Sequence, residues 1–172
     1  MVNKKVEITV ISDVHLGTFG SHAEEVLIYL DSINPEVLII NGDLVDIWQF
    51  RKRYFPKSHL AVLQKVFQIA ASGKTVYFIP GNHDDLIRKF GDFSFGNIYV
   101  QNELTLTIGG KKIWFHHGDK YDKTVRNQNS KNRPSKTVLQ RHYDHHYQGM
   151  NQLDYLSITC RLTENNHAIR QV

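Results

Sequence analysis

The chain has little cysteine and no long hydrophobic run, and both absences narrow what it can be. Its 172 residues include one cysteine, Cys160, which excludes an internal disulfide and a cysteine-rich zinc site. No apolar stretch approaches the roughly 20 residues that a membrane-spanning helix needs. The first residues, Met1 to Lys5, lack the apolar core and the cleavage site of a signal peptide. These features predict a cytoplasmic protein.

The remaining composition is that of a soluble globular protein, with 41% hydrophobic and 22% charged residues. The length suits about one domain. A net charge of +4 favours anionic partners, and leaves nucleic acid, phospholipid surfaces and phosphorylated metabolites all open. From about Lys123 the chain is rich in Asn, Gln, Arg, Lys and His. We therefore predict one domain over residues 1–122 and a poorly specified tail over residues 123–172.

Four short polar motifs each follow an apolar run. They are Asp13-Val14-His15, Gly42-Asp43-Leu44-Val45-Asp46, Gly81-Asn82-His83-Asp84 and His116-His117-Gly118-Asp119. Short apolar runs that end at turn residues predict buried strands. Because ligands in α/β sheets collect beyond the carboxyl ends of strands, these side chains are expected at one edge. Oxygen and imidazole groups suit a divalent metal, which can activate water against a phosphate ester.

The helices and strands between the motifs predict the fold class. Ser21 and Glu24 have capping-box spacing for a helix that Asn34-Pro35 ends, and Ser58 is the expected cap of a second helix. The apolar positions expected on that second helix are Leu60, Leu63, Val66, Phe67 and Ala70. A short helix is expected over 85–90, with strands over 98–100 and 104–108. Gly109-Gly110 should join the last strand to 112–115 as a hairpin. This order predicts a layered α/β domain with a mixed sheet flanked by helices.

The chemistry of the motifs assigns roles to individual residues. Two divalent cations held about 3.5–4 Å apart can clamp the attacking and leaving oxygens of a displacement on phosphorus. Asp43 is the expected bridge between them. Asp13 and His15, on the same side of an extended segment, would hold one cation. Asn82 and His117 would hold the second, since alternation turns His116 to the other face.

His83 is expected to point away from Asn82, toward the substrate phosphate. There it would stabilise charge or protonate the leaving alcohol, with Asp46 orienting its imidazole.

Each motif taken singly has an ordinary alternative. Asp13 and His15 could form a turn and a surface histidine, and Asp43 and Asp46 could cap helices. Gly81-Asn82 is a common turn dipeptide, and Asp84 and Asp85 are expected to favour a helix N-terminus. The ordered co-occurrence of all four motifs after apolar runs favours the metal site.

Residues 11–119 resemble the calcineurin-like metallophosphoesterase superfamily, whose signature is D-x-H, G-D-x-x-D, G-N-H-[DE] and later histidines. The resemblance implies a β-sandwich flanked by helices. It also implies the metal ligands Asp13, His15, Asp43, Asn82 and His117, and the catalytic pair Asp46 and His83.

A closer resemblance, to the UDP-2,3-diacylglucosamine hydrolases, covers residues 43–59 and the H-G-D-x-x-D sequence of residues 117–122. It implies manganese-dependent cleavage of a pyrophosphate in lipid A biosynthesis, giving UMP and a lipid-linked sugar phosphate. A lipid-linked nucleotide substrate further implies peripheral contact with the inner face of the membrane. The residues then expected near the substrate are Trp48, Arg51, Arg53 and Tyr54. The alternatives are packing for the two aromatic residues and a solvated face for the two arginines.

The sequence departs from the family pattern at His83, where some members of the hydrolase family carry Arg and others His, and it also has no G-H-x-H motif. The tail over residues 123–172 is therefore interpreted as truncated or frame-disrupted, and the loss of two imidazoles would weaken metal retention. Two alternatives to the hydrolase remain: a nuclease or general phosphodiesterase, and an inactive remnant of such a hydrolase.

Overall fold

The computed structural model describes residues 4–47, 54–119, 155–158 and 170–171. Its helices are α1 (Ala23–Ser32), α2 (Lys57–Ala71) and α3 (Asp85–Arg88). Its strands are β1 (Lys4–Ile11), β2 (Ile33–Asn41), β3 (Thr75–Ile79), β4 (Phe93–Phe95), β5 (Ile98–Val100), β6 (Leu104–Ile108), β7 (Lys111–Phe115), β8 (Tyr155–Ile158) and β9 (Arg170–Gln171).

The strands form a mixed six-stranded sheet and a second sheet of three strands. The larger sheet has the order β4-β5-β3-β2-β1-β9, and the smaller has the order β6-β7-β8. β1, β2, β3 and β5 run parallel to one another, whereas β4 and β9 at the two edges of the larger sheet are antiparallel. The carboxyl ends of the parallel strands therefore lie along one edge, as the motif positions require.

The predicted hairpin is confirmed. β6 and β7 pair antiparallel, with Ile108 opposite Lys111. Gly109 and Gly110 between them have φ of 57° and 78°, the left-handed conformation that a two-residue hairpin turn favours at both positions.

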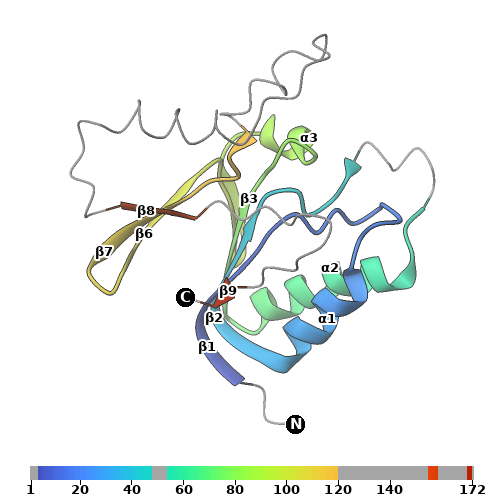
Figure 1. Cartoon of the computed structure of the whole chain (residues 1–172), viewed down its shortest axis with the longest axis horizontal. Helices are drawn as coiled ribbons and strands as arrows, with labels where there is room; N and C mark the ends of the chain where they lie inside the picture. Colours follow the sequence, from blue (N-terminus) through green and yellow to red (C-terminus); the bar gives the residue numbers. More distant parts are fainter. Residues whose placement is uncertain (1–3, 48–53, 120–154, 159–169, 172) are drawn as a thin grey trace, which may run out of the picture.

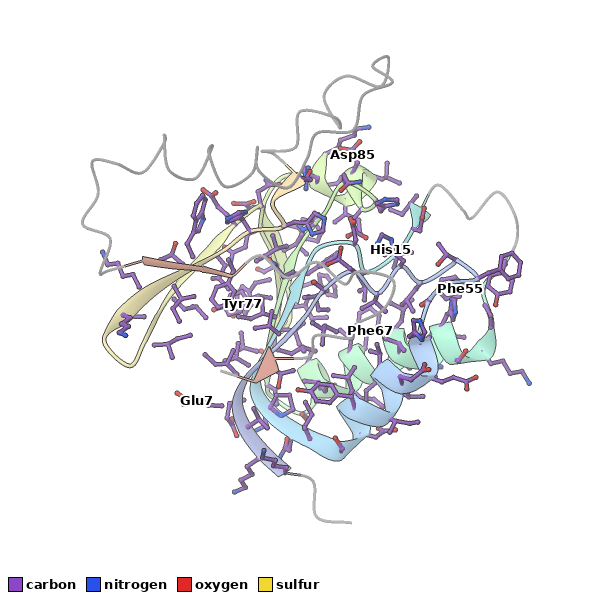
Figure 2. All side chains as sticks on the ribbon, viewed as in Figure 1. Glu7, His15, Phe55, Phe67, Tyr77 and Asp85 are labelled. Carbon is purple, nitrogen blue, oxygen red and sulfur yellow. The ribbon has the colours of Figure 1, made fainter. Side chains whose placement is uncertain are left out.

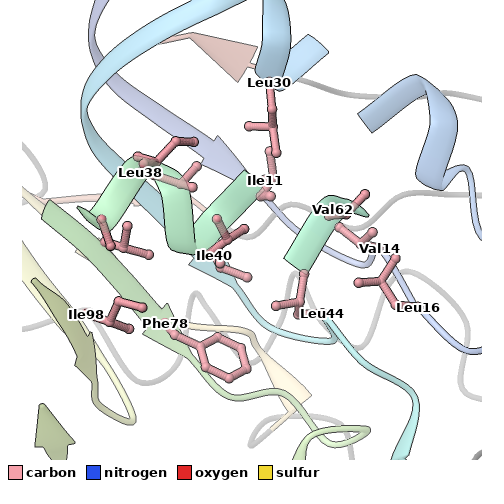
Figure 3. Packing of buried hydrophobic residues seen from close by; sticks show 14 of the residues in the cluster. Ile11, Val14, Leu16, Leu30, Leu38, Ile40, Leu44, Val62, Phe78 and Ile98 are labelled. Carbon is pink, nitrogen blue, oxygen red and sulfur yellow. The ribbon is translucent and has the colours of Figure 1, made fainter. Parts of the chain in front are cut away.

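The two faces of the larger sheet are both covered. On one face Leu38 and Ile40 of β2 pack in a cluster with Leu30 of α1 and Val62 of α2 (Figure 3). On the other face the alternate residue, Ile39, joins a second cluster, completed by Ile8, Val10, Ile79, Leu104, Ile113 and Phe115. Figure 1 shows α1 and α2 on one side of the larger sheet and the β6–β7 hairpin on the other. The predicted fold class, layered α/β with sheets flanked by helices, is confirmed.

Burial on both faces explains the continuous apolar runs before the motifs. α1 ends at Ser32, just before the predicted stop at Asn34-Pro35, and that pair itself lies inside β2. Pro35 is in register with Val6 of β1, whereas β3 pairs with β2 only from Val37 onward, so the proline lies where β2 is paired with β1 and not with β3.

Both predicted helix caps are wrong. α1 begins at Ala23, and the Ser21 hydroxyl donates instead to the Val14 carbonyl at 2.7 Å. α2 begins at Lys57, with Pro56 at the N-cap position where Ser58 was expected. In each case the serine lies close to the true boundary but has no capping hydrogen bond.

The buried face of α2 is also displaced from the predicted one. Val66 and Ala70 are buried as expected, but Leu60 and Phe67 are 50% and 53% exposed. The buried face is completed by His59, Val62 and Ile69. α3 ends at Arg88, two residues before the predicted Phe90, and β4 was not predicted.

The division at residue 122 stays a prediction. β8 and β9 fall within the predicted tail, and most of the rest of that segment lies outside the described residues. In the part of the chain that the structure describes, no helix combines the length and apolarity needed to cross a membrane.

Candidate metal centre

The candidate site lies just past the carboxyl ends of the parallel strands. Figure 2 shows His15 at the same end of the molecule as Asp85, whereas Glu7, near the start of β1, lies at the opposite end. The loops that follow β1, β2, β3 and β7 supply the predicted site residues. The first three motifs therefore lie at the edge that the parallel strands predict. The fourth follows β7 of the smaller sheet, which was not expected, and still brings His117 to Asp43.

The loop after β1 turns sharply. Asp13 and His15 have left-handed backbone conformations, with φ of 54° and 50°. The expected alternation of an extended segment does not apply, so this reason for their convergence is wrong. Instead the loop is paired with the loop after β2: the Asp13 N–H donates to the Gly42 carbonyl at 3.1 Å, and the His15 N–H donates to the Asp43 carbonyl at 2.9 Å. This pairing presents both side chains beside Asp43.

The Asp43 carboxylate is the centre of the cluster and is almost fully buried. Its Oδ2 lies 3.2 Å from His117 Nε2 and 3.8 Å from His15 Nε2. Asp43 belongs to two groups whose candidate ligand atoms lie within 4.8 Å of one another: one with Asp13 and His117, the other with His15 and His83. A carboxylate shared by two groups has the geometry of a bridge.

Two motif glycines make this close approach possible. A Cβ at Gly42 would lie 2.0 Å from His117 Nδ1, and a Cβ at Gly81 would lie 2.0 Å from Asp43 Oδ1. Any side chain at either position would displace a candidate ligand. Close packing at the site therefore requires glycine as the first residue of both G-D-x-x-D and G-N-H-D.

The His117 ring is oriented by the backbone. Its Nδ1 lies 3.0 Å from the Asn41 carbonyl, so Nδ1 carries the proton and donates it. Nε2 then faces Asp43, the arrangement typical of a metal-binding imidazole held by a carbonyl.

The electrostatics of His117 and Asp43 favour a positive charge between these two side chains. Burial lowers the pKa of His117, but the hydrogen bond to Asp43 and the Asp43 charge outweigh it and raise that pKa to about 9. Burial raises the pKa of Asp43, but the hydrogen bond and the charge of His117 outweigh it and hold that pKa below its ordinary value. The pKa of Asp13 is raised, chiefly by burial. Asp43 is therefore held in its charged form, and the proton that His117 retains beside it marks a position where a divalent cation can bind instead.

His83 lies beside Asp46, as predicted. Its Nδ1 is 3.1 Å from Asp46 Oδ2, and its ring stands edge-on to the His15 ring with centroids 4.7 Å apart. The His83 side chain is 34% exposed, whereas that of Asp46 is 5% exposed. A partly exposed imidazole therefore stands beside a buried carboxylate. Asn82 lies in the same turn, between Gly81 and His83, and is half-buried.

Of the four predicted substrate-binding residues, only Tyr54 lies within the described part of the chain; Trp48, Arg51 and Arg53 lie outside it. The Tyr54 ring lies 3.9 Å from the Phe19 ring and 5.8 Å from the His59 ring, measured between centroids. These contacts are those expected of a packing residue. A substrate role for the four stays a prediction.

Sequence reasoning missed the role of Asp84. Asp84 stands at the N-cap position of α3 and Asp85 in its first turn, as expected, but the Asp84 side chain forms no capping hydrogen bond. Its carboxylate accepts hydrogen bonds from the N–H groups of Leu44, Val45 and Gly81. Burial raises the pKa of Asp84. The signal available in the sequence was its place directly after Gly81-Asn82-His83.

Sequence reasoning also missed an ion pair between two loops of the site. Arg88 of α3 binds Asp119 through two nitrogens, at 2.6 and 3.1 Å, and also donates to the Pro80 carbonyl at 2.5 Å. This pair joins the segment after β3 to the loop after β7. No periodicity links these positions, which lie 31 residues apart.

The comparison with protein families decides the family. The model of calcineurin-like phosphoesterases matches residues 6–166, nearly the whole chain. The chain belongs to the calcineurin-like phosphoesterase family. The resemblance inferred from the motifs is confirmed, and the family supports a hydrolase that acts on phosphoester or pyrophosphate bonds.

Several curated relatives of this phosphoesterase chain are named UDP-2,3-diacylglucosamine hydrolase. The protein from Histophilus somni is 30% identical over 63% of this chain and 47% of its own length. Those from Vibrio vulnificus and Pectobacterium carotovorum are 28% and 33% identical, over 63% and 52% of this chain and 46% and 37% of their own lengths. The chain thus spans about half or less of the length of these relatives.

Among solved structures, this phosphoesterase chain matches a conserved uncharacterised protein from Streptococcus pneumoniae, described as a predicted phosphoesterase. The two are 20% identical, with a TM-score of 0.30 over 70% of this chain and 50% of the other.

Proposed function

We propose that this phosphoesterase is a hydrolase that uses two divalent cations to cleave a phosphate ester or a pyrophosphate. The observation that carries the proposal is the position of Asp43, whose carboxylate belongs to both candidate ligand groups. When bound, the two cations would activate a water molecule and stabilise charge on the phosphate oxygens.

The proposed ligands are the five predicted ones, with Asp43 shared by both cations. The prediction assigns Asp13 and His15 to one cation, and Asn82 and His117 to the other. In the structure Asp13 lies with His117 around Asp43, and His15 lies with His83. The grouping in the structure therefore associates Asp13 with His117, whereas the prediction associated it with His15. Manganese is the proposed metal, a hard cation suited to carboxylate oxygens.

The chain's own groups act on the substrate phosphate. His83 is proposed to donate a proton to the leaving oxygen, and Asp46 to hold the imidazole that does so. The partly exposed ring beside a buried carboxylate supports this division of roles.

The proposed substrate is a lipid-linked nucleotide, UDP-2,3-diacylglucosamine, in lipid A biosynthesis. The names of the relatives support it. We further propose that Trp48, Arg51, Arg53 and Tyr54 contact this substrate, and that the protein is cytoplasmic and touches the membrane peripherally. The net charge of +4 favours a nuclease as the second candidate.

The test compares the wild-type chain with Asp43→Asn in MnCl₂. Release of UMP from UDP-2,3-diacylglucosamine and cleavage of single-stranded DNA would be measured, together with bound manganese. We expect UMP release from the wild type and a loss of more than about 100-fold in Asp43→Asn, since weaker perturbations outside the ligand set already cost 10–100-fold. Asp31→Asn, the same change in an exposed carboxylate paired with Lys65, is the matched control and should behave as wild type.

Full activity and full manganese content in Asp43→Asn would overturn the bridging role. Cleavage of DNA without UMP release would favour the nuclease, and well under two bound manganese ions without turnover would favour an inactive remnant.

A further inference from the structure

Asp84 is the most deeply buried carboxylate near the candidate site, with 0% of the residue exposed. Its Oδ1 accepts the N–H of Val45 at 3.0 Å. Its Oδ2 accepts the N–H of Leu44 and that of Gly81, both at 3.2 Å. One carboxylate therefore binds three backbone donors on two different loops.

These donors adjoin the proposed ligands. Leu44 and Val45 directly follow Asp43 in the loop after β2, and Gly81 directly precedes Asn82 in the loop after β3. Asp84 therefore links the loop that carries the shared carboxylate to the loop that carries Asn82 and His83.

The loop after β2 and the loop after β3 are in close contact at this point. The His83 N–H donates to Asp43 Oδ1 at 2.9 Å. The open side of Gly81 faces the same oxygen so closely that a Cβ there would lie 2.0 Å from it. A small shift of either loop would therefore move Asp43 relative to Asn82 and His83.

An ordinary structural role for Asp84 would be to cap its own helix. α3 has no side-chain cap, and the carboxylate is instead directed at the two loops. The next residue provides the contrast, because Asp85 pairs with Lys89 on the surface at 2.9 Å. The two adjacent aspartates thus have different surroundings: Asp84 binds the two loops of the site, and Asp85 forms an ion pair with Lys89.

We propose that Asp84 is a positioning residue, which sets the spacing of the two cation positions by fixing the loop after β2 against the loop after β3. The inference rests on the proposed function and adds a residue to it. Asp84 itself touches neither cation nor substrate. Groups outside the ligand set that orient metal ligands change metal affinity by about 10- to 100-fold.

The decisive variant is Asp84→Asn, with Asp85→Asn as the matched control. The amide keeps the shape of the side chain but replaces one acceptor oxygen with an NH₂ group, which would face a backbone donor. Mn²⁺ would be titrated into each protein, and low-temperature electron paramagnetic resonance would report whether two bound Mn²⁺ ions are magnetically coupled. Circular dichroism and thermal unfolding in manganese-free buffer would report the fold.

We expect a coupled spectrum from the wild type and from Asp85→Asn. Asp84→Asn should remain folded, bind its second Mn²⁺ about 10- to 100-fold more weakly and lose the coupled spectrum. Wild-type binding with a wild-type spectrum in Asp84→Asn would overturn the inference alone. Weaker binding that keeps the coupled spectrum at saturation would also overturn it, because the spacing would be unchanged.

Asp84→Ser, which is smaller and keeps an acceptor, replaces Asp84→Asn in the same titration if the amide variant fails to fold. If both variants are unfolded without manganese, Asp84 is a folding determinant and the positioning role is overturned. A wild-type chain that binds no Mn²⁺ would contradict the proposed function together with this inference.

Discussion

Asp13, His15 and Asp43 are the non-glycine residues with positive φ among the residues that the structure describes, and all three belong to the candidate site. Each such conformation costs on the order of 1–3 kcal/mol and persists only where the surroundings fix it. Here the surroundings are the backbone hydrogen bonds between the loops after β1 and β2. The sequence motifs predicted that these residues lie together, but the extended backbone predicted for Asp13 and His15 is wrong. Alternation of side chains applies to strands and gives no information about a turn that a distant loop stabilises.

The His59 side chain is also held by a distant loop, and its burial predicts that stability depends on pH. It is buried in α2, and its Nδ1 accepts the N–H of Gly17 at 2.8 Å. Burial lowers its pKa, so the native state keeps this histidine neutral. As pH falls through the ordinary value of about 6.5, the unfolded chain takes up a proton that the native chain does not. The stability contributed by neutral His59 should therefore be lost progressively as pH falls below about 6.5.

Urea unfolding of the wild type and His59→Asn at several pH values would measure this loss. Asparagine keeps an acceptor near the Gly17 N–H but does not titrate. The free energy of unfolding should fall less steeply on acidification in His59→Asn than in the wild type. The same substitution at the exposed His22 serves as the control. Parallel curves for wild type and His59→Asn would show that His59 does not account for the acid sensitivity.

At the scale of elements, strands and the hairpin were predictable because their signals are local. Gly109-Gly110 specifies a tight turn, and residues 98–100 and 104–108 form strands with the predicted bounds. Helix boundaries and faces were less predictable. Leu60 and Phe67 have helical spacing, but so do Val62 and Val66, and only contact with β2 and α1 decides which face is buried.

The contact between α3 and the loop after β7 carries a stability prediction. Asp119 is largely buried and receives two bonds from Arg88. Asp119→Asn should lower the free energy of unfolding by about 2–3 kcal/mol, because it removes a charged partner from a partly buried guanidinium. Glu36→Gln is the matched control: Glu36 pairs with Lys74 at the surface, and exposed pairs contribute about 0–1 kcal/mol. Equal losses in the two variants, measured by urea unfolding, would contradict a special role for the Arg88 pair.

At the scale of the whole molecule, the layered fold and the site edge followed from the order of apolar runs and motifs. Parallel strands place successive motifs at one edge, so the convergence of Asp13, Asp43 and Asn82 was predictable from the sequence. His117 follows β7 of the smaller sheet, and its position depends on how the two sheets pack. The hydrogen bonds of Asp84 and Arg88 could not be predicted from the sequence. Each joins residues that come close together only when the loops pack against each other.

The site also joins the two sheets, which predicts that manganese stabilises the whole molecule. Asp13 and Asp43 follow strands of the larger sheet, whereas His117 follows β7 of the smaller one. A cation bound by all three would hold the native arrangement and be lost on unfolding. At 100 times its dissociation constant Mn²⁺ should add about 2.7 kcal/mol, which raises the melting temperature by about 5–10 °C.

This gain should depend on pH through His117, whose pKa is raised to about 9. In manganese-free buffer the proton on His117 contributes stability that is complete below the unfolded value of about 6.5 and is lost as pH rises through 9. Mn²⁺ must displace that proton, so the melting temperature should rise more on adding Mn²⁺ at pH 8.5 than at pH 6.5. Thermal unfolding in degassed buffer would measure both gains, with His22→Ala as the control and His117→Ala as the variant that loses the gain. A gain that is independent of pH, or that survives in His117→Ala, would show that the cation does not bind at Asp43, whose carboxylate lies in one candidate ligand group with Asp13 and His117.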